Sequence, residues 1–345
     1  MLDYFPPPCE MDKIVNMTIA ACDPLDGRTD GVVARTDLCK LNFNINSTIG
    51  AAYSCAASTG SSLGFGFGQK VKRQMGPPST SEPAQNGTVS AKGAALAARL
   101  YDGMFNSKGE RVYLPWQTAS SFEDATTKFN SNTSSWELDI TSFGGEFVTK
   151  FIQEVDIDNL SSLNNVTYDT LAEWMNTAMI KYMDSLQTTL PDLTPFQSSG
   201  GKVIHYHGES DDSIPPASSV HYYDSVRSIM YPDQSYNESI ASLQSWYKLF
   251  LVPGAAHCST NTLQPGPYPA NNMATMIDWV ENGIEPTAGL NATVSSGKLA
   301  GEVQKLCAYP LRPYWSNNST MVCQYDQPSI DSWTYTLDAF KLPVY

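Results

Sequence analysis

The sequence predicts an α/β fold, because its C-terminal part alternates between strand and helix patterns. KVIHYHG at 202–208 has the glycine lead-in and the apolar run of a buried parallel strand, and YKLFLVPGA at 247–255 follows as a second strand. Helical patterns are expected between and after these strands, at Ser218–Met230, Glu238–Trp246 and Asn271–Glu281. Strands that alternate with helices are typical of the α/β class.

The N-terminal part is less regular. Residues 1–57 are rich in cysteine and in loop residues, with one helical pattern around Met11–Ala21. Residues 58–90 are rich in Gly, Ser, Pro and Gln, which indicates a flexible linker or an exposed loop. This linker contains the dibasic pair Lys72-Arg73, which is either a processing site for a Kex2-like protease or two ordinary solvated charges.

The middle of the chain connects these two parts. AKGAALAARLYDGMF at 91–105 has apolar residues at helical spacing, and residues 170–186 form an amphipathic helical pattern. Between them, WELDI and EFVTK are expected to be short strands. We therefore expect residues 1–195 to form an irregular, loop-rich domain, and residues 196–345 to form part of an α/β sheet domain.

Charge and hydropathy exclude several classes of partner. The formal net charge of −14 argues against a nucleic acid or an anionic membrane, because phosphate binding needs clustered Lys and Arg. No apolar run reaches the length of about 18 residues that a transmembrane helix requires. The sequence therefore predicts no nucleic-acid partner and no membrane partner.

Glycosylation motifs and cysteines indicate a secreted, extracellular protein. Seven cysteines fall in two clusters with one left over, and this odd count suggests a partner outside the sequence. The start, MLDYFPPPCEMDKI, lacks the basic and apolar regions of a signal peptide, so we expect a missing front end. The N-x-S/T motifs lie at Asn16, Asn46, Asn86, Asn132, Asn159, Asn165, Asn237, Asn291, Asn317 and Asn318.

Acid–base residues follow both predicted strands, at the sheet edge where open α/β sheets collect their chemistry. Asp211 and Asp212 come after the first strand, and His257 comes after the second. This order matches the second and third members of the Ser…Asp…His sequence of α/β-hydrolases. In such a triad the His accepts the serine proton, while the Asp fixes the tautomer and stabilises the imidazolium. Adjacent carboxylates point in different directions, so only one of the two can serve.

The sequence has four histidines, and their positions indicate different roles. His257 is the one on a loop after a strand, and we predict that it is the base. His205 and His207 lie inside a strand, which favours structural or supporting roles. His221 lies in a helix and is expected at the surface.

HGESDDSIPP at 207–216 together with PGAAHC at 253–258 resembles the tannase and feruloyl esterase family, whose triad His is directly followed by a Cys. The resemblance covers essentially the whole chain and is closest to the fungal tannase branch. It also includes CEMDKIVNMTIAACDPLDGRTDGVV, NVTYDTLAEWMNTAMIKYMDSLQTTLPDLTPFQSSGGK and LQPGPYPANNM. The resemblance implies the C-terminal part of an α/β-hydrolase core with a large, loop-rich lid domain.

The resemblance also implies a function and its residues. It implies a serine carboxylic ester hydrolase that acts on small aromatic esters, such as galloyl or feruloyl esters. Asp211 would be the triad acid and His257 the base. In the family, the Cys after the His is disulfide-bonded to a Cys immediately before the nucleophilic Ser, so Cys258 would be the leftover cysteine.

The nucleophile itself is not found in this sequence. A nucleophile elbow, of the G-x-S-x-G or Gly-Cys-Ser type, sits between a strand and a helix. STGSSLGFGFG at 58–68 has no strand before it and no helix after it, and SSGG at 198–201 precedes a strand. We expect the Ser, its neighbouring Cys and the oxyanion-hole amides upstream of Met1, which leaves this segment inactive alone. The alternative is a catalytically dead, calcium-stabilised extracellular binding domain on an esterase fold.

The stretch DPLDGRTDGVV holds three carboxylates within eight residues. Closely spaced oxygen donors on a turn-rich loop suit Ca²⁺, although the spacing alone also fits an acidic solvated turn. The family resemblance implies a structural calcium site that uses the side chains of Asp23, Asp26 and Asp30. The backbone carbonyls of Arg28 and Val32 would complete it.

Three disulfides are predicted for the remaining cysteines. One closes the calcium loop, one closes a C-terminal loop, and the third joins the two cysteines that remain in the first cluster. The pairs are Cys22–Cys39, Cys307–Cys323 and Cys9–Cys55.

Overall fold

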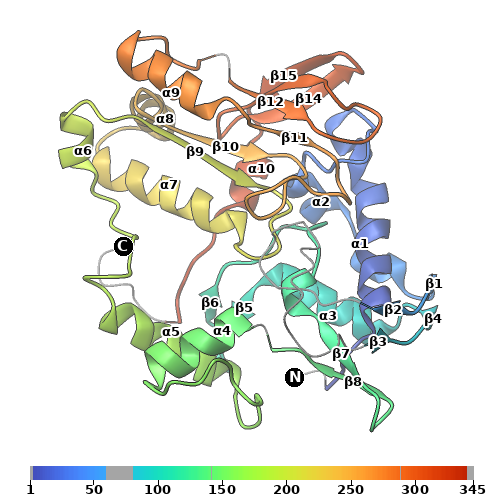
Figure 1. Cartoon of the computed structure of the whole chain (residues 1–345). Coiled ribbons are helices and arrows are strands. Elements are labelled where there is room, and N and C mark those ends of the chain that lie inside the picture. The colour runs from blue at the N-terminus through green and yellow to red at the C-terminus, as the bar shows by residue number, and fades with distance from the viewer. Residues whose placement is uncertain (1–2, 60–80, 141, 288, 340–345) are drawn as a thin grey trace.

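The structure is a computed structural model that describes residues 3–59, 81–140, 142–287 and 289–339. Much of the expected linker, including Lys72-Arg73 and most of the stretch at 58–68, lies outside the described residues. The expectation that no strand precedes the stretch at 58–68 is wrong, because Ala52–Cys55 and Ser58–Thr59 are strands. Figure 1 shows the described chain, in which the strands β9 and β10 lie between helix α7 and the small C-terminal sheets.

Short helices and short strands alternate along most of the described chain. The helical elements are α1 Pro8–Cys22, η1 Asp23–Asp26, α2 Thr36–Asn42, η2 Ile45–Thr48, α3 Ala91–Asp102, η3 Glu123–Ala125, α4 Ser142–Phe147, η4 Val148–Ile152, α5 Tyr168–Lys181, α6 Thr194–Ser198, α7 Pro216–Met230, α8 Tyr236–Gln244, α9 Asn272–Glu281 and α10 Gln327–Ser332. The strands are β1 Ala52–Cys55, β2 Ser58–Thr59, β3 Ser81–Glu82, β4 Gln85–Thr88, β5 Met104–Phe105, β6 Arg111–Tyr113, β7 Thr127–Asn130, β8 Ser135–Leu138, β9 Val203–Gly208, β10 Tyr247–Val252, β11 Pro267–Tyr268, β12 Leu290–Val294, β13 Val303–Leu306, β14 Arg312–Asn317 and β15 Thr320–Gln324.

The two strands predicted in the C-terminal part are present and pair in parallel as β9 and β10. All six residues of β10 are buried, as expected of a continuous apolar run that is covered on both faces. Its one charged residue, Lys248, is buried and forms an ion pair with Glu285 at 2.7 Å. The paired charge explains how lysine is accommodated in this strand.

The two faces of β10 pack into two separate cores, because successive side chains of a strand point to opposite sides. Leu249 and Leu251 join a core with residues of α7 and α8. Phe250 and Val252 join a core with residues of β12 and β13. The sheet β11-β12-β13 is antiparallel. The parallel pair is therefore held between helices on one face and a small sheet on the other (Figure 1).

A third core joins the N-terminal helices. Ile14 and Val15 of α1 pack with Ala97 and Tyr101 of α3 and with Phe122. In Figure 1 the N-terminal segment, drawn in blue, runs beside both the green middle part and the red C-terminal strands. The division of the chain at residue 195 remains a prediction.

Charged residues of the N-terminal segment bind the C-terminal part. Arg28 forms two hydrogen bonds to Glu302, at 2.7 and 2.8 Å. Arg35 pairs with Asp326 at 2.6 Å. Residues that the sequence assigns to the lid therefore pack against the predicted core.

One strand prediction is wrong. WELDI contains most of β8, which pairs with β7, but EFVTK lies in α4 and η4. Phe147 and Phe151, four residues apart, stack with ring centroids at 5.1 Å. This i, i+4 contact is available only in a helix, and a short apolar run does not distinguish the two periods.

The predicted helix over 170–186 appears as α5, but it has no buried residue. Several large apolar side chains of this region are exposed, among them Ile180 and Met183. In the part of the chain that the structure describes, no helix is long and apolar enough to cross a membrane.

Candidate active site

The site lies where β9 and β10 end. In the parallel pair His207 lies beside Leu251, and Gly208 lies beside Val252. The chain then continues into two loops on the same sheet edge. The backbone N–H of Ser210 donates to the carbonyl of Ala255 at 2.9 Å, which joins the two loops directly.

Asp211 and His257 meet between these loops. Oδ2 of Asp211 lies 3.1 Å from Nδ1 of His257. Oδ1 of Asp211 accepts hydrogen bonds from the backbone N–H groups of Ser213 at 2.9 Å and Ile214 at 2.8 Å. These bonds fix the carboxylate, so that the Nδ1–H tautomer of His257 is favoured and its basic nitrogen is Nε2.

The environment of Asp211 keeps it ionised. Its side chain is 4% exposed, and that of His257 is 16% exposed. Burial alone would raise the pKa of the Asp211 carboxyl, but the hydrogen bonds from His207, Ile214 and Ser213 hold this pKa below its ordinary value. An ionised carboxylate beside an imidazole can orient the ring and stabilise its protonated form.

His257 lies in a tight turn. The backbone N–H of Ala256 donates to the carbonyl of Ser259 at 3.0 Å. Cys258 has a φ of 52°, a left-handed conformation that is uncommon outside glycine. Cys258 is exposed, and it is the free cysteine among those described. The turn therefore presents His257 and an accessible thiol side by side.

Asp212, the competing carboxylate, faces another way. It is buried, and its Oδ2 has no hydrogen-bond partner among the described residues. Burial and the charges of Glu123 and Asp124 raise the pKa of Asp212 to about 7. Of the two adjacent carboxylates, the structure brings Asp211 and not Asp212 to His257.

The other histidines differ in their surroundings. His207 contacts Asp211, with Nε2 at 3.2 Å from Oδ2. His205 contacts Tyr247 and Ser219, at 2.8 and 2.9 Å. His207 therefore touches a candidate site residue, whereas His205 is linked to the site only through Ser219 and His207. The supporting roles of both histidines stay predictions. His221 lies on α7 and is partly buried, not fully at the surface as expected.

A buried charge cluster lies behind the site, and no pattern in the sequence predicts it. Glu209 accepts hydrogen bonds from Arg312 at 2.6 Å and from Thr36 at 2.6 Å. Arg312 also donates to Asp37 at 3.1 Å, and Asp37 pairs with Arg35 at 2.8 Å. Burial opposes ionisation, but the two arginines lower the pKa of Asp37 to about 2. This cluster anchors the loop that carries Asp211.

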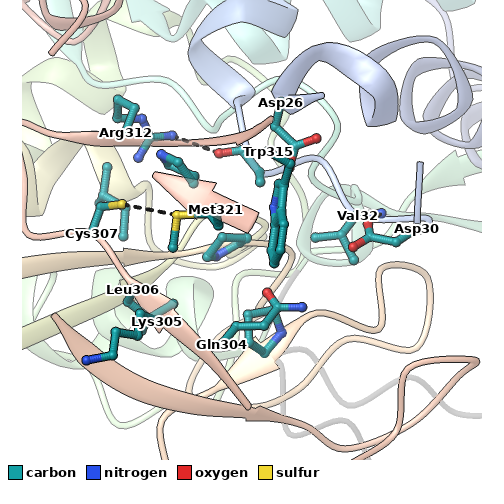
Figure 2. Close-up of a pocket in the computed structure, with 15 residues that line it drawn as sticks. Asp26, Asp30, Val32, Gln304, Lys305, Leu306, Cys307, Arg312, Trp315 and Met321 are labelled. Atoms are coloured by element: carbon teal, nitrogen blue, oxygen red, sulfur yellow. Dashed lines mark hydrogen bonds between the residues drawn. The ribbon is translucent and has the colours of Figure 1, made fainter. Parts of the chain in front are cut away.

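The acidic loop predicted to bind calcium lines the same pocket as Arg312 of this cluster. Asp23, Asp26 and Arg28 are buried, and Asp30 is 11% exposed. Figure 2 shows Asp26, Asp30 and Val32 on one side of a pocket that Trp315 also lines. The Arg28 guanidinium lies over the Trp315 ring at 4.2 Å, which fastens the loop to β14.

The donor chemistry of this loop fits a hard cation, but its carboxylates have other partners. Asp23 accepts from the N–H groups of Asp30 and Gly31, both at 3.0 Å. Asp26 accepts from the N–H of Arg28 at 2.9 Å. In the described residues, no three His, Cys, Asp or Glu side chains converge as a metal site would require. The loop is therefore not arranged as a preformed three-carboxylate site.

The predicted disulfides are present. Cys22–Cys39 closes the acidic loop, Cys307–Cys323 joins the segment directly after β13 to β15, and Cys9–Cys55 joins α1 to β1.

Comparison with known proteins identifies the family of the chain. A family model described as "Tannase and feruloyl esterase" matches residues 1–330. The chain belongs to the tannase and feruloyl esterase family. It is 66% identical to a protein named tannase from Aspergillus oryzae, over 100% of this chain and 59% of that protein. It is 27% identical to a probable feruloyl esterase from Arthroderma benhamiae, over 97% of this chain and 53% of that protein.

Solved structures of this family agree with the fold. Tannin acyl hydrolase from Aspergillus niger matches with a TM-score of 0.91 and 54% identity, over 100% of this chain and 58% of that one. Feruloyl esterase B from Aspergillus oryzae matches with a TM-score of 0.65 and 21% identity, over 93% of this chain and 58% of that one. The chain thus spans just over half the length of these family members.

Proposed function

We propose that Asp211 and His257 supply the acid and the base of a serine carboxylic ester hydrolase acting on aromatic esters, either galloyl or feruloyl. The observation that carries this proposal is the 3.1 Å contact between Asp211 Oδ2 and His257 Nδ1 at the ends of adjacent parallel strands. Family membership supports the reaction class. In this proposal residues 196–345 form the later part of an α/β-hydrolase core, and residues 1–195 form most of its lid.

The proposed reaction has two stages. His257 Nε2 takes the proton of a serine hydroxyl while the serine oxygen attacks the ester carbonyl, and it then protonates the leaving alcohol. In the second stage His257 deprotonates water, which attacks the acyl-enzyme, and His257 then returns the proton to the serine oxygen as the carboxylic acid leaves. Asp211 keeps the ring oriented and stabilises the imidazolium in both stages.

The serine is proposed to come from a segment N-terminal to these residues, and a cysteine beside it would bond to Cys258. Two observations support this. The Gly-Cys-Ser turn of the family does not occur in the sequence, and the chain spans 59% of the A. oryzae tannase. Cys258 is exposed, next to His257 and outside the three disulfides. A bond at Cys258 would hold nucleophile and base together.

We also propose that the acidic loop binds a structural Ca²⁺ through the side chains of Asp23, Asp26 and Asp30 and the carbonyls of Arg28 and Val32. The support is chemical: hard oxygen donors gathered on one largely buried loop. Calcium would have to draw the carboxylates from their backbone partners, so binding should be accompanied by a change in the loop.

Secretion is part of the same proposal. Ten N-x-S/T motifs and three disulfides suit a protein that passes through an oxidising, glycosylating compartment. Glycosidase treatment of the protein from a native culture medium should lower its mass, whereas retention inside the cell would contradict the proposal.

The decisive experiment uses the full protein encoded by the complete reading frame. Hydrolysis of methyl gallate and methyl ferulate is measured for wild type, His257→Ala and His221→Ala. His257→Ala should lower kcat by at least about 10³-fold, because the serine loses its base. His221→Ala is the matched control, a histidine on α7 with no role in the reaction.

The two substrates decide between gallate and ferulate as the preferred acyl group. Full kcat in the His257→Ala variant would refute the assigned base. A wild-type protein that binds calcium but hydrolyses neither ester would favour the binding-domain alternative.

A further inference from the structure

A second histidine shares the carboxylate oxygen that His257 contacts. Oδ2 of Asp211 lies 3.2 Å from Nε2 of His207, in addition to 3.1 Å from Nδ1 of His257. Since Oδ1 already accepts two backbone N–H groups, both oxygens of Asp211 hold two hydrogen bonds each. A carboxylate offers about four such positions, so Asp211 has no further freedom to turn.

The contacts of His207 fix its tautomer. Nε2 also lies 3.0 Å from the carbonyl oxygen of Ile214, which can only accept. Nε2 must therefore carry the proton, and it points that proton between Ile214 and Asp211. In the neutral ring Nδ1 is then an acceptor, and it receives the hydroxyl proton of Ser219 across 2.7 Å.

The same reasoning extends two residues further. Ser219 has given its one proton to His207, so its oxygen accepts from Nε2 of His205 at 2.9 Å. Nδ1 of His205 is then an acceptor for the Tyr247 hydroxyl at 2.8 Å. All hydrogen bonds run one way, from Tyr247 through His205, Ser219 and His207 to Asp211.

This hydrogen-bond chain is partly buried. Tyr247 is 2% exposed and Ser219 is 8% exposed. Burial and the neighbouring His207 lower the pKa of His205 to about 4, so His205 stays neutral above that pH and keeps its single donor. Its members come from β9, the start of β10 and α7, three elements that pack together (Figure 1).

We propose that His207 is a positioning residue for the proposed reaction, held by Ser219, His205 and Tyr247, and that it fixes Asp211 in the orientation His257 needs. The inference rests on the proposed function, because it assigns the carboxylate of Asp211 a role in orienting the base. His207 itself touches no reacting atom. It donates one hydrogen bond to Asp211, and this bond restricts rotation of the Asp211 side chain.

Replacement of His207 tests this in the complete enzyme. His207→Phe keeps a planar ring but removes the donor to Asp211, so kcat should fall by about 10- to 100-fold with KM within about twofold. The acidic limb of the kcat/KM profile should move to higher pH, since Asp211 then loses a donor that favours its ionised form. A residue of merely structural importance would not shift this limb.

A conservative variant separates positioning from packing. The side-chain amide of His207→Gln can place an N–H near the position of Nε2, so most of the lost kcat and the wild-type acidic limb should return. Ser219→Ala removes the support of His207 without touching Asp211, and a smaller shift in the same direction is expected. Ser225→Ala, which removes a hydroxyl bonded to the His221 carbonyl on the same helix, is the matched control and should leave both readouts unchanged.

Thermal unfolding of each variant accompanies the kinetics. If His207→Phe does not fold, the Ser219→Ala profile decides the matter. Wild-type kcat and pH profile in folded His207→Phe, or in Ser219→Ala when the first variant is unfolded, would overturn the inference. So would a His207→Gln variant as impaired as His207→Phe.

His257→Ala, measured in parallel, distinguishes failure of the inference from failure of the proposed function. If His257→Ala is inactive while His207→Phe equals wild type, the inference alone is wrong. If His257→Ala keeps full activity, the proposed function is wrong and the inference falls with it.

Discussion

A Cβ atom on Gly208 would lie 2.4 Å from the carbonyl oxygen of Ala255, closer than any side chain can approach backbone. Gly208 ends β9, and Ala255 lies in the loop after β10. The absence of a side chain at this point lets the loop of Asp211 and the loop of His257 touch. The close contact of Asp211 and His257, the proposed acid and base, thus depends on a glycine that has no proposed role in the reaction.

Gly208→Ala should therefore separate the two loops. Because the contacting atoms are backbone, they cannot move aside, and the variant should lose about 1–3 kcal/mol of unfolding free energy and most of its esterase activity. Denaturant unfolding and kcat measure the two effects. Gly144→Ala is the control, since its Cβ would meet nothing within 4 Å and α4 favours alanine. Equal stability of the two variants would contradict the prediction.

Asp211→Asn should lower activity strongly, whereas Asp212→Asn should leave it almost unchanged. Asn at 211 can present its N–H₂ group to His257 and so stabilise the wrong tautomer, which should lower kcat by at least about 10³-fold. Asn at 212 leaves the contact between Asp211 and His257 in place and should keep kcat within about threefold. Steady-state kinetics of both variants decide this, and a larger loss at position 212 would reverse the assignment of the acid.

Asp212 should also make stability depend on pH. Its folded pKa of about 7 is above the unfolded value near 3.8, so the folded state holds the proton more tightly and loses stability as pH rises through that window. Asp212→Asn removes this loss and should be more stable than wild type at pH 7, by about 1–3 kcal/mol, but not at pH 4. Thermal unfolding at both values tests this. Asp233→Asn, at an exposed carboxylate, should show no such difference.

Arg312→Met should destabilise the fold strongly. The substitution leaves Glu209 and Asp37 buried without their shared cation, which should cost about 3–5 kcal/mol. Arg99→Met removes an exposed ion pair with Asp102 and should cost about 1 kcal/mol or less. Urea unfolding compares the two, and similar losses would show that the buried cluster contributes little.

Removal of calcium should lower the thermal stability of the protein. If the acidic loop binds Ca²⁺, EGTA should lower the Tm by about 5 °C or more, and added Ca²⁺ should restore it. Asp26→Asn should weaken this response because it removes one charged donor. An unchanged Tm in EGTA, with no heat of Ca²⁺ binding by calorimetry, would refute the site.

The sequence was sufficient for the parts of the site that depend on position along strands. The apolar runs of β9 and β10 are typical of buried parallel strands. Residues directly after adjacent parallel strands meet at one edge of the sheet. This is why Asp211 and His257 could be predicted to lie together. EFVTK was assigned wrongly because its short apolar run fits a helix as well as a strand.

Other features depend on contacts that no local pattern encodes. Arg312 reaches Glu209 and Asp37, which are 103 and 275 residues away. The contact of His207 with Asp211 depends on ring orientation and on Ser219 from α7. The spacing of His205 and His207 in β9 could have predicted this contact. A strand places residues two apart on the same face, here beside the turn that carries Asp211.

The ion pairs that join the first 40 residues to the C-terminal strands have a consequence for chain integrity. Both disulfides before residue 60, Cys9–Cys55 and Cys22–Cys39, close within residues 9–55, so no described disulfide links residues before 60 to residues after 80. A proteolytic cut anywhere in residues 60–80 would therefore give two polypeptides that elute as one particle in native buffer. Denaturant without any reducing agent would release the smaller piece, unless a bond formed elsewhere holds it.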